Sequence, residues 1–120
     1  MIVTFHSIDN ENEKVFFKTK GEQKENSIFF KDESMPNTTI ELKIEASSVE
    51  LIRSGDYNTN MLFQKNKKTK AYYRNNLGLE FDFYVETKVL DIKKNKISIE
   101  YNMFLFEEEI STHKIWILLH

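Results

Sequence analysis

The 120-residue sequence predicts an all-β fold: a single closed antiparallel up-and-down barrel of about ten strands, formed by one domain, residues 1–120. Apolar and polar residues alternate with a period of two along most of the chain, as in strands with one buried face. The connections between these segments are short and polar, which favours antiparallel neighbours. A meander of that length would leave two exposed edges, and closure into a barrel removes them. A two-sheet sandwich is the second choice.

The first half of the chain supplies five expected strands, each ended by polar turn residues. They cover residues 2–8, 15–21, 27–31, 38–45 and 49–53. The fourth alternates most cleanly, with Ile40, Leu42 and Ile44 on one face. The lone proline, Pro36, falls in the loop before it, where its missing N–H does no harm.

The second half supplies five more strands, again separated by turns rich in Asn, Lys and Glu. They cover residues 60–64, 69–74, 79–92, 97–105 and 110–119. In the long strand, the alternation places Leu79, Phe81 and Val89 on the inward face. Near Val89 and Leu90 the apolar phase slips by one residue, which predicts a β-bulge that bends the strand.

Composition limits the classes of protein that the chain can belong to. Apolar residues make up 40 % and charged residues 30 %, typical of a globular domain, and no stretch approaches the length of a membrane span. The absence of Cys excludes disulfides and thiolate chemistry. No signal peptide is visible, so we expect a cytoplasmic protein, and the excess of Lys over Arg with abundant Asn and Ile indicates an A/T-rich bacterial genome.

Several stretches also resemble a known family in their order and spacing. They are residues 39–44, 49–55, 61–63, 87–90 and 97–103, together with Tyr73 and Gly78. Across about two thirds of its length the chain resembles the YwiB-like family of small uncharacterised bacterial proteins, which are calycin-like, lipocalin-type β-barrels. The resemblance implies the barrel fold and brings no activity with it.

Arg53 is the sharpest candidate for a functional residue. It shares the inward phase of Val49 and Leu51, and a buried guanidinium must find partners. One hypothesis is that Arg53 clamps the carboxylate of an apolar ligand, since its planar fork suits such anions. The preferred alternative is structural: Arg53 bonds backbone carbonyls near the barrel end or stacks on an aromatic ring such as Trp116.

A barrel of this size is either filled by side chains or wide enough for one small ligand. The candidate ligand-binding residues are Arg53, Phe63, Phe81, Phe83, Tyr101 and Met103. We therefore predict non-enzymatic binding of a small apolar or amphipathic ligand in the barrel interior. The alternative is a structural or interaction protein that acts through its outer surface.

One basic and aromatic hairpin could serve that alternative. Its candidate nucleic-acid residues are Lys65, Lys67, Lys68, Lys70, Tyr72 and Arg74. Aromatic rings beside cations are what single-stranded nucleic acid binders use. The net charge of −2 favours a solvated hairpin instead, so we do not expect nucleic acid as a partner.

Catalytic and metal chemistry find no support in the sequence. His6, His113 and His120 lack metal-ligand spacing, and His113 reads as a core or rim histidine because it shares the face of Ile115. Glu80 and Asp82 read as solvated surface. We predict no enzyme, no cofactor and no metal.

The outward phase carries large apolar side chains, whose gathering on one wall would form a patch for a partner. They are Leu62, Tyr72, Tyr84, Phe104, Phe106 and Trp116. We therefore expect a homodimer through the barrel walls.

Overall fold

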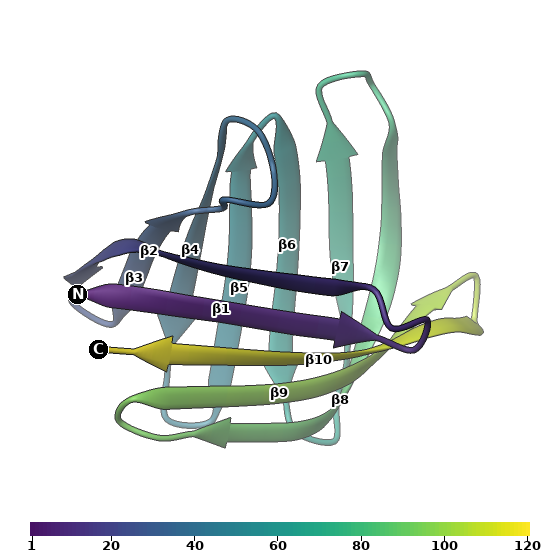
Figure 1. Ribbon diagram of the computed structural model, residues 1–120. Coiled ribbons are helices and arrows are strands. Elements are labelled where there is room, and N and C mark those ends of the chain that lie inside the picture. Colours follow the sequence, from purple (N-terminus) through teal and green to yellow (C-terminus); the bar gives the residue numbers. More distant parts are fainter.

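The computed structural model describes residues 1–120 and shows a ten-stranded, closed, antiparallel barrel (Figure 1). The strands, in chain order, are β1 (Ile2–Asp9), β2 (Lys14–Lys24), β3 (Ser27–Lys31), β4 (Thr38–Ile44), β5 (Ser48–Gly55), β6 (Tyr57–Gln64), β7 (Lys68–Asn75), β8 (Glu80–Ile92), β9 (Lys96–Leu105) and β10 (Glu108–Leu119). Each predicted strand is present, with ends that differ by at most a few residues. The predicted all-β up-and-down barrel is therefore confirmed.

Closure comes from pairing between the first and last strands. β1 pairs with β2 on one side and with β10 on the other. Ile2 and His120 exchange two backbone hydrogen bonds, with N···O distances of 2.7 and 2.9 Å. In Figure 1, β1, β2, β9 and β10 run across the view in front of the roughly perpendicular strands β4 to β7. Because the first and last strands pair, the sheet has no free edge strand.

A β-bulge bends β8 from one strand direction into the other (Figure 1). The pairing of β8 with β9 shifts register between Thr87 and Val89, which confirms the predicted bulge and places it at Lys88. For two residues, the inward orientation predicted from the alternation was wrong. Val89 is exposed because the phase slips before it rather than after it. Leu79 is exposed because it lies in the turn before β8.

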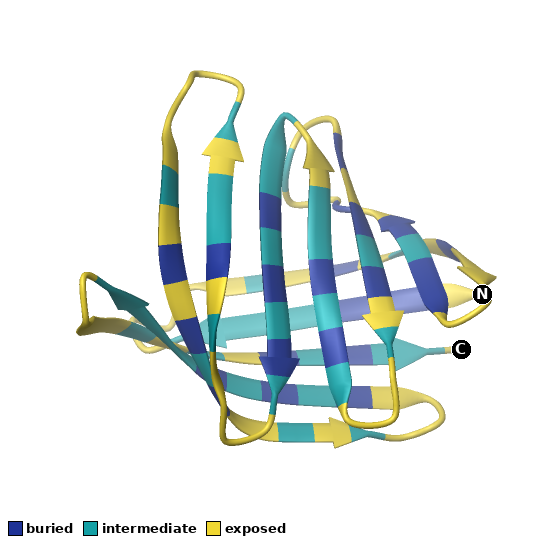
Figure 2. Cartoon of the chain, turned by 180° about the vertical axis from the view of Figure 1, so that it is seen from behind, coloured by how far each residue is buried: buried dark blue, intermediate teal, exposed yellow.

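Inward-facing side chains fill the barrel with one apolar core. Buried and exposed residues alternate along the strands, visible as bands in Figure 2. Nineteen buried residues form one cluster, and the rings of Phe5 and Phe17 stack at 5.1 Å within it. Burying each such large side chain contributes about 1.5–3 kcal/mol. The core therefore occupies the middle of the barrel.

The two open ends of the barrel differ, and we name them here. The loop end carries the β1–β2, β3–β4, β5–β6, β7–β8 and β9–β10 connections. The terminal end carries the other connections and both chain termini.

Candidate functional site

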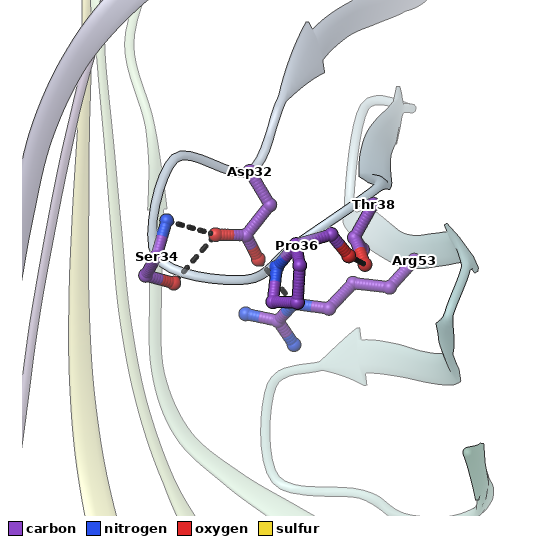
Figure 3. Close-up of polar contacts among 5 residues, drawn as sticks. All are labelled: Asp32, Ser34, Pro36, Thr38 and Arg53. Carbon is purple, nitrogen blue, oxygen red and sulfur yellow. Dashed lines mark hydrogen bonds and ion pairs between the residues drawn. The ribbon is translucent and has the colours of Figure 1, made fainter. Parts of the chain in front are cut away.

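Arg53 points into the barrel near the loop end, as its phase predicts. On β5 it lies between Ile40 of β4 and Thr59 of β6, both buried. Its Nε donates a hydrogen bond of 2.9 Å to Oδ2 of Asp32, whose side chain is fully buried (Figure 3). The two terminal nitrogens of Arg53 have no hydrogen-bond partner in the protein. The expected contacts with backbone carbonyls or Trp116 are absent, because Trp116 faces outward beside His6.

The loop between β3 and β4 holds Asp32 in place. Oδ1 of Asp32 accepts hydrogen bonds from the backbone N–H and the hydroxyl of Ser34, at 3.0 and 2.5 Å (Figure 3). The Thr38 hydroxyl donates to the carbonyl oxygen of Pro36 at 2.8 Å and closes the loop. Both carboxylate oxygens of Asp32 therefore have donors, as a buried charge requires.

Tyr101 and His113 add two polar side chains to the interior that holds Arg53 and Asp32. Their rings stack at 4.8 Å, and Nε2 of His113 is 2.7 Å from the Ser111 hydroxyl. Burial raises the pKa of Tyr101 to about 12, against the opposing effect of the Arg53 charge. Burial also lowers the pKa of His113 from 6.5, which the nearby Asp9 charge partly opposes. His113 is thus a half-buried rim histidine, as predicted.

His113 makes stability depend on pH. Its pKa is lower in the folded than in the unfolded chain, so the unfolded chain binds the proton more readily. Its contribution is therefore complete above pH 6.5 and declines as pH falls through that value towards the folded pKa. We expect the fall in melting temperature between about pH 7.5 and 5.5 to be smaller in His113→Gln than in the wild type. Equal falls would show that His113 is not a cause.

The other predicted ligand-binding residues belong to the packed interior. Phe63 and Phe83 are buried, and the Phe63 ring lies 4.9 Å from that of Tyr101. Phe81 and Met103 are half-buried against the core. The five main cavities of the structure lie elsewhere and are lined by none of these residues or by Arg53. A ligand role for them stays a prediction that would require side chains to move.

A cavity of about 510 Å³ opens instead at the terminal end of the barrel. Five inward apolar side chains line it, contributed by β3, β4, β8, β9 and β10: Ile28, Ile44, Ile92, Ile97 and Leu119. Its polar rim includes Lys93 and Lys94 of the β8–β9 turn. A second hollow, of about 790 Å³, adjoins it and shares Gln23, Lys94 and Leu119.

Carboxylates of β8 largely neutralise the basic hairpin. Nζ of Lys70 lies 3.3 Å from Oδ2 of Asp82, and Arg74 is paired in register with Glu80. Carboxylates of the neighbouring strand repel phosphate and so weaken the attraction that these cations exert on it. The structure thus gives no support to this hairpin as a nucleic-acid site.

The large outward side chains do not all gather on one wall. Tyr84 and Phe104 pair across β8 and β9, and the Lys68 ammonium lies 3.9 Å from the centre of the Phe104 ring. Trp116 lies on another wall, beside His6. The homodimer through the barrel walls stays a prediction.

No group of three or more His, Asp or Glu side chains is placed to hold a metal ion. No helix of the structure is long and apolar enough to cross a membrane.

Sequence reasoning missed two features of the barrel ends. Asp32 was assigned to a polar turn, although an Asp two residues before a Ser is a signal of a side chain that bonds its own backbone. The cavity at the terminal end was missed because its lining residues read as ordinary core positions.

Comparison with known proteins supports the fold. The sequence model of a domain of unknown function (DUF1934) matches residues 1–117. Among solved structures, the chain is similar to the crystal structure of the YwiB protein from Bacillus subtilis, with a TM-score of 0.72 and 23 % sequence identity. The match covers 99 % of this chain and 90 % of that chain. No curated protein matches the sequence.

Proposed function

The chain belongs to the DUF1934 family, whose function is unknown, and we propose from its own geometry that it binds a small amphipathic anion without catalysis. The apolar part of the ligand enters the cavity at the terminal end of the barrel, and its anionic group lies at the lysine rim. A cytoplasmic location, expected from the sequence, is part of this proposal.

The cavity at the terminal end is the observation that carries the proposal. Its volume of about 510 Å³ falls within the range of about 300–1,000 Å³ that small-molecule sites occupy. Half of its ten lining residues are apolar, and they converge from strands on opposite sides of the barrel. Burial of an apolar tail there yields about 25 cal/mol for each Å² removed from water.

The rim carries two lysines, Lys93 and Lys94, against one carboxylate, Glu25. Lys94 forms no ion pair and borders both hollows. Lys93 lies 3.5 Å from Asp91, with both side chains mostly exposed, so this pair is weak. An ammonium beside an apolar cavity favours a ligand with a carboxylate or a phosphate at one end.

Arg53 is the basis of a second placement of the same ligand. Its two terminal nitrogens are free to donate hydrogen bonds to a carboxylate, as the sequence hypothesis requires. The packed rings of Phe63 and Tyr101 lie deeper in the same interior, so this placement needs a cavity to open. The terminal end already has one, and for that reason we place the ligand there.

Titration calorimetry with decanoate and decanol, which differ chiefly in charge, tests the proposal. We expect decanoate to bind at least about tenfold more tightly, because one charged hydrogen bond is worth roughly 1.5–3 kcal/mol. The double variant Lys93→Gln/Lys94→Gln should lose this difference. Ile44→Asp, which puts a charge on the cavity wall, should abolish binding of both ligands.

Leu77→Asp is the matched control, because Leu77 is exposed in the β7–β8 turn at the other end of the barrel. It should bind both ligands like the wild type. Undiminished decanoate binding by a folded Ile44→Asp variant would move the site to Arg53. Absence of binding by the wild type would refute the proposal for this ligand class.

A further inference from the structure

An aromatic row crosses the outer face of the barrel where β1 lies between β2 and β10. Phe16, His6 and Trp116 are consecutive partners in register, one on each strand. The ring of His6 lies 5.8 Å from that of Phe16 and 5.1 Å from that of Trp116. Phe16 is 62 % exposed, which is unusual for a side chain of this size.

Lysines border this row on both sides. The neighbouring rows of the same face place Lys14, Lys18, Lys20 and Lys96 around it, all exposed and none in an ion pair. Glu100 is the only carboxylate in the rows that cross β2, β1, β10 and β9, and Lys114 already pairs with it at 3.5 Å. Asp91, which follows Ser98 in the aromatic row on β8, pairs with Lys93 at 3.5 Å. Unlike the hairpin of β7, this face therefore keeps its positive charge.

The face is also hollowed. A cavity of about 200 Å³ is lined by Thr4, His6, Phe16, Lys96, Trp116 and Leu118. Two aromatic rings, an imidazole and an ammonium thus surround one small depression. A flat ring that carries an anionic group matches this combination.

We propose that this face binds single-stranded nucleic acid, with bases stacked on Phe16 and Trp116 and phosphates at the surrounding lysines. Adjacent strands lie about 4.8 Å apart, so a row of rings across them offers successive stacking positions. The site is independent of the ligand proposed for the terminal end.

The positive charge of this face favours nucleic acid over a second copy of this chain as its partner. A two-fold symmetric dimer through this face would place the same patch on both sides of the interface. The lysines of one copy would then lie near those of the other, which is unfavourable. A polyanion gains from every one of these lysines, because each phosphate that it neutralises releases a counterion.

Trp116 allows a direct test, because it is the only tryptophan of the chain. We expect a single-stranded oligothymidylate to quench its fluorescence, with affinity that falls as salt rises. Phe16→Ala should weaken binding by about fivefold or more, since one stacked base is worth roughly 1–3 kcal/mol. Lys18→Ala should reduce the slope of log K against log salt by about 0.7, the value for one phosphate of a single strand.

Phe106→Ala is the matched control, because Phe106 is 92 % exposed in the β9–β10 turn, away from this face. It should bind like the wild type. Neither quenching nor a change in the anisotropy of a labelled oligonucleotide at about 50 mM salt would overturn the proposal. Binding that Phe16→Ala leaves unchanged would also overturn it. So would a sedimenting dimer that Phe16→Ala converts to monomer, because a second copy would then cover the face.

Discussion

Replacing Arg53 with alanine is expected to destabilise the fold by about 3–5 kcal/mol, the usual cost of removing one partner from a buried ion pair. The Asp32 carboxylate is fully buried and would keep only the two donors of Ser34. The cavity left inside the barrel adds to the cost. Urea unfolding followed by circular dichroism measures the change as a shift of the midpoint at constant slope.

The Asp32→Asn variant distinguishes the effect of the lost ion pair from the effect of the cavity, because asparagine keeps the shape of the side chain without its charge. In that background no carboxylate is stranded, so Arg53→Ala should cost clearly less than it does in the wild type. An equal cost in both backgrounds would show that the cavity, rather than the lost pairing, is responsible. The same unfolding measurement is the control for ligand-binding experiments, because an Arg53 variant that binds no ligand is informative only if it is folded.

The strands could be predicted from the sequence because the pattern that determines them involves residues close together in the chain. Alternation with a period of two fixes which side chains face inward, and short polar links fix the antiparallel order. Arg53 was assigned to the interior by this argument alone, and the structure confirms that it points inward. The bulge of β8 was predicted for the same reason, because a slip of phase is visible in the sequence.

The partners of these residues depend on contacts that are distant in sequence. The Asp32 loop reaches Arg53 across 21 positions, and alternation contains no information about where a loop folds. The row through Phe16, His6 and Trp116 exists only because β1 pairs with β10 when the barrel closes. The hairpin looked basic in sequence because the carboxylates that neutralise it belong to the next strand.

Gly55→Ala is expected to cost more than about 3 kcal/mol, because the turn between β5 and β6 holds the loop that carries Asp32. Gly55 has φ of 131°, a conformation that residues with a side chain rarely adopt. A Cβ atom there would lie 1.9 Å from the carbonyl oxygen of Asn37. That oxygen accepts a hydrogen bond of 3.2 Å from the N–H of Asp56, so the loop cannot withdraw without losing it.

Gly78→Ala is the matched control for this effect. Gly78 also has positive φ, at 89°, but a Cβ atom there would meet nothing within 4 Å. It should therefore cost only the strain of its backbone, of about 1 kcal/mol. The difference between the two variants in urea unfolding measures the clash with Asn37, and equal losses would refute it.

The double variant Gly55→Ala/Arg53→Ala then tests whether the turn and the ion pair act as one unit. If the turn stabilises the fold mainly by seating the Asp32 loop, displacing the loop already exposes the carboxylate, and Arg53 loses its partner in either case. The combined loss should fall short of the sum of the single losses by more than about 0.5 kcal/mol. Strict additivity would mean that the loop stays seated without Gly55 and that the clash is relieved elsewhere.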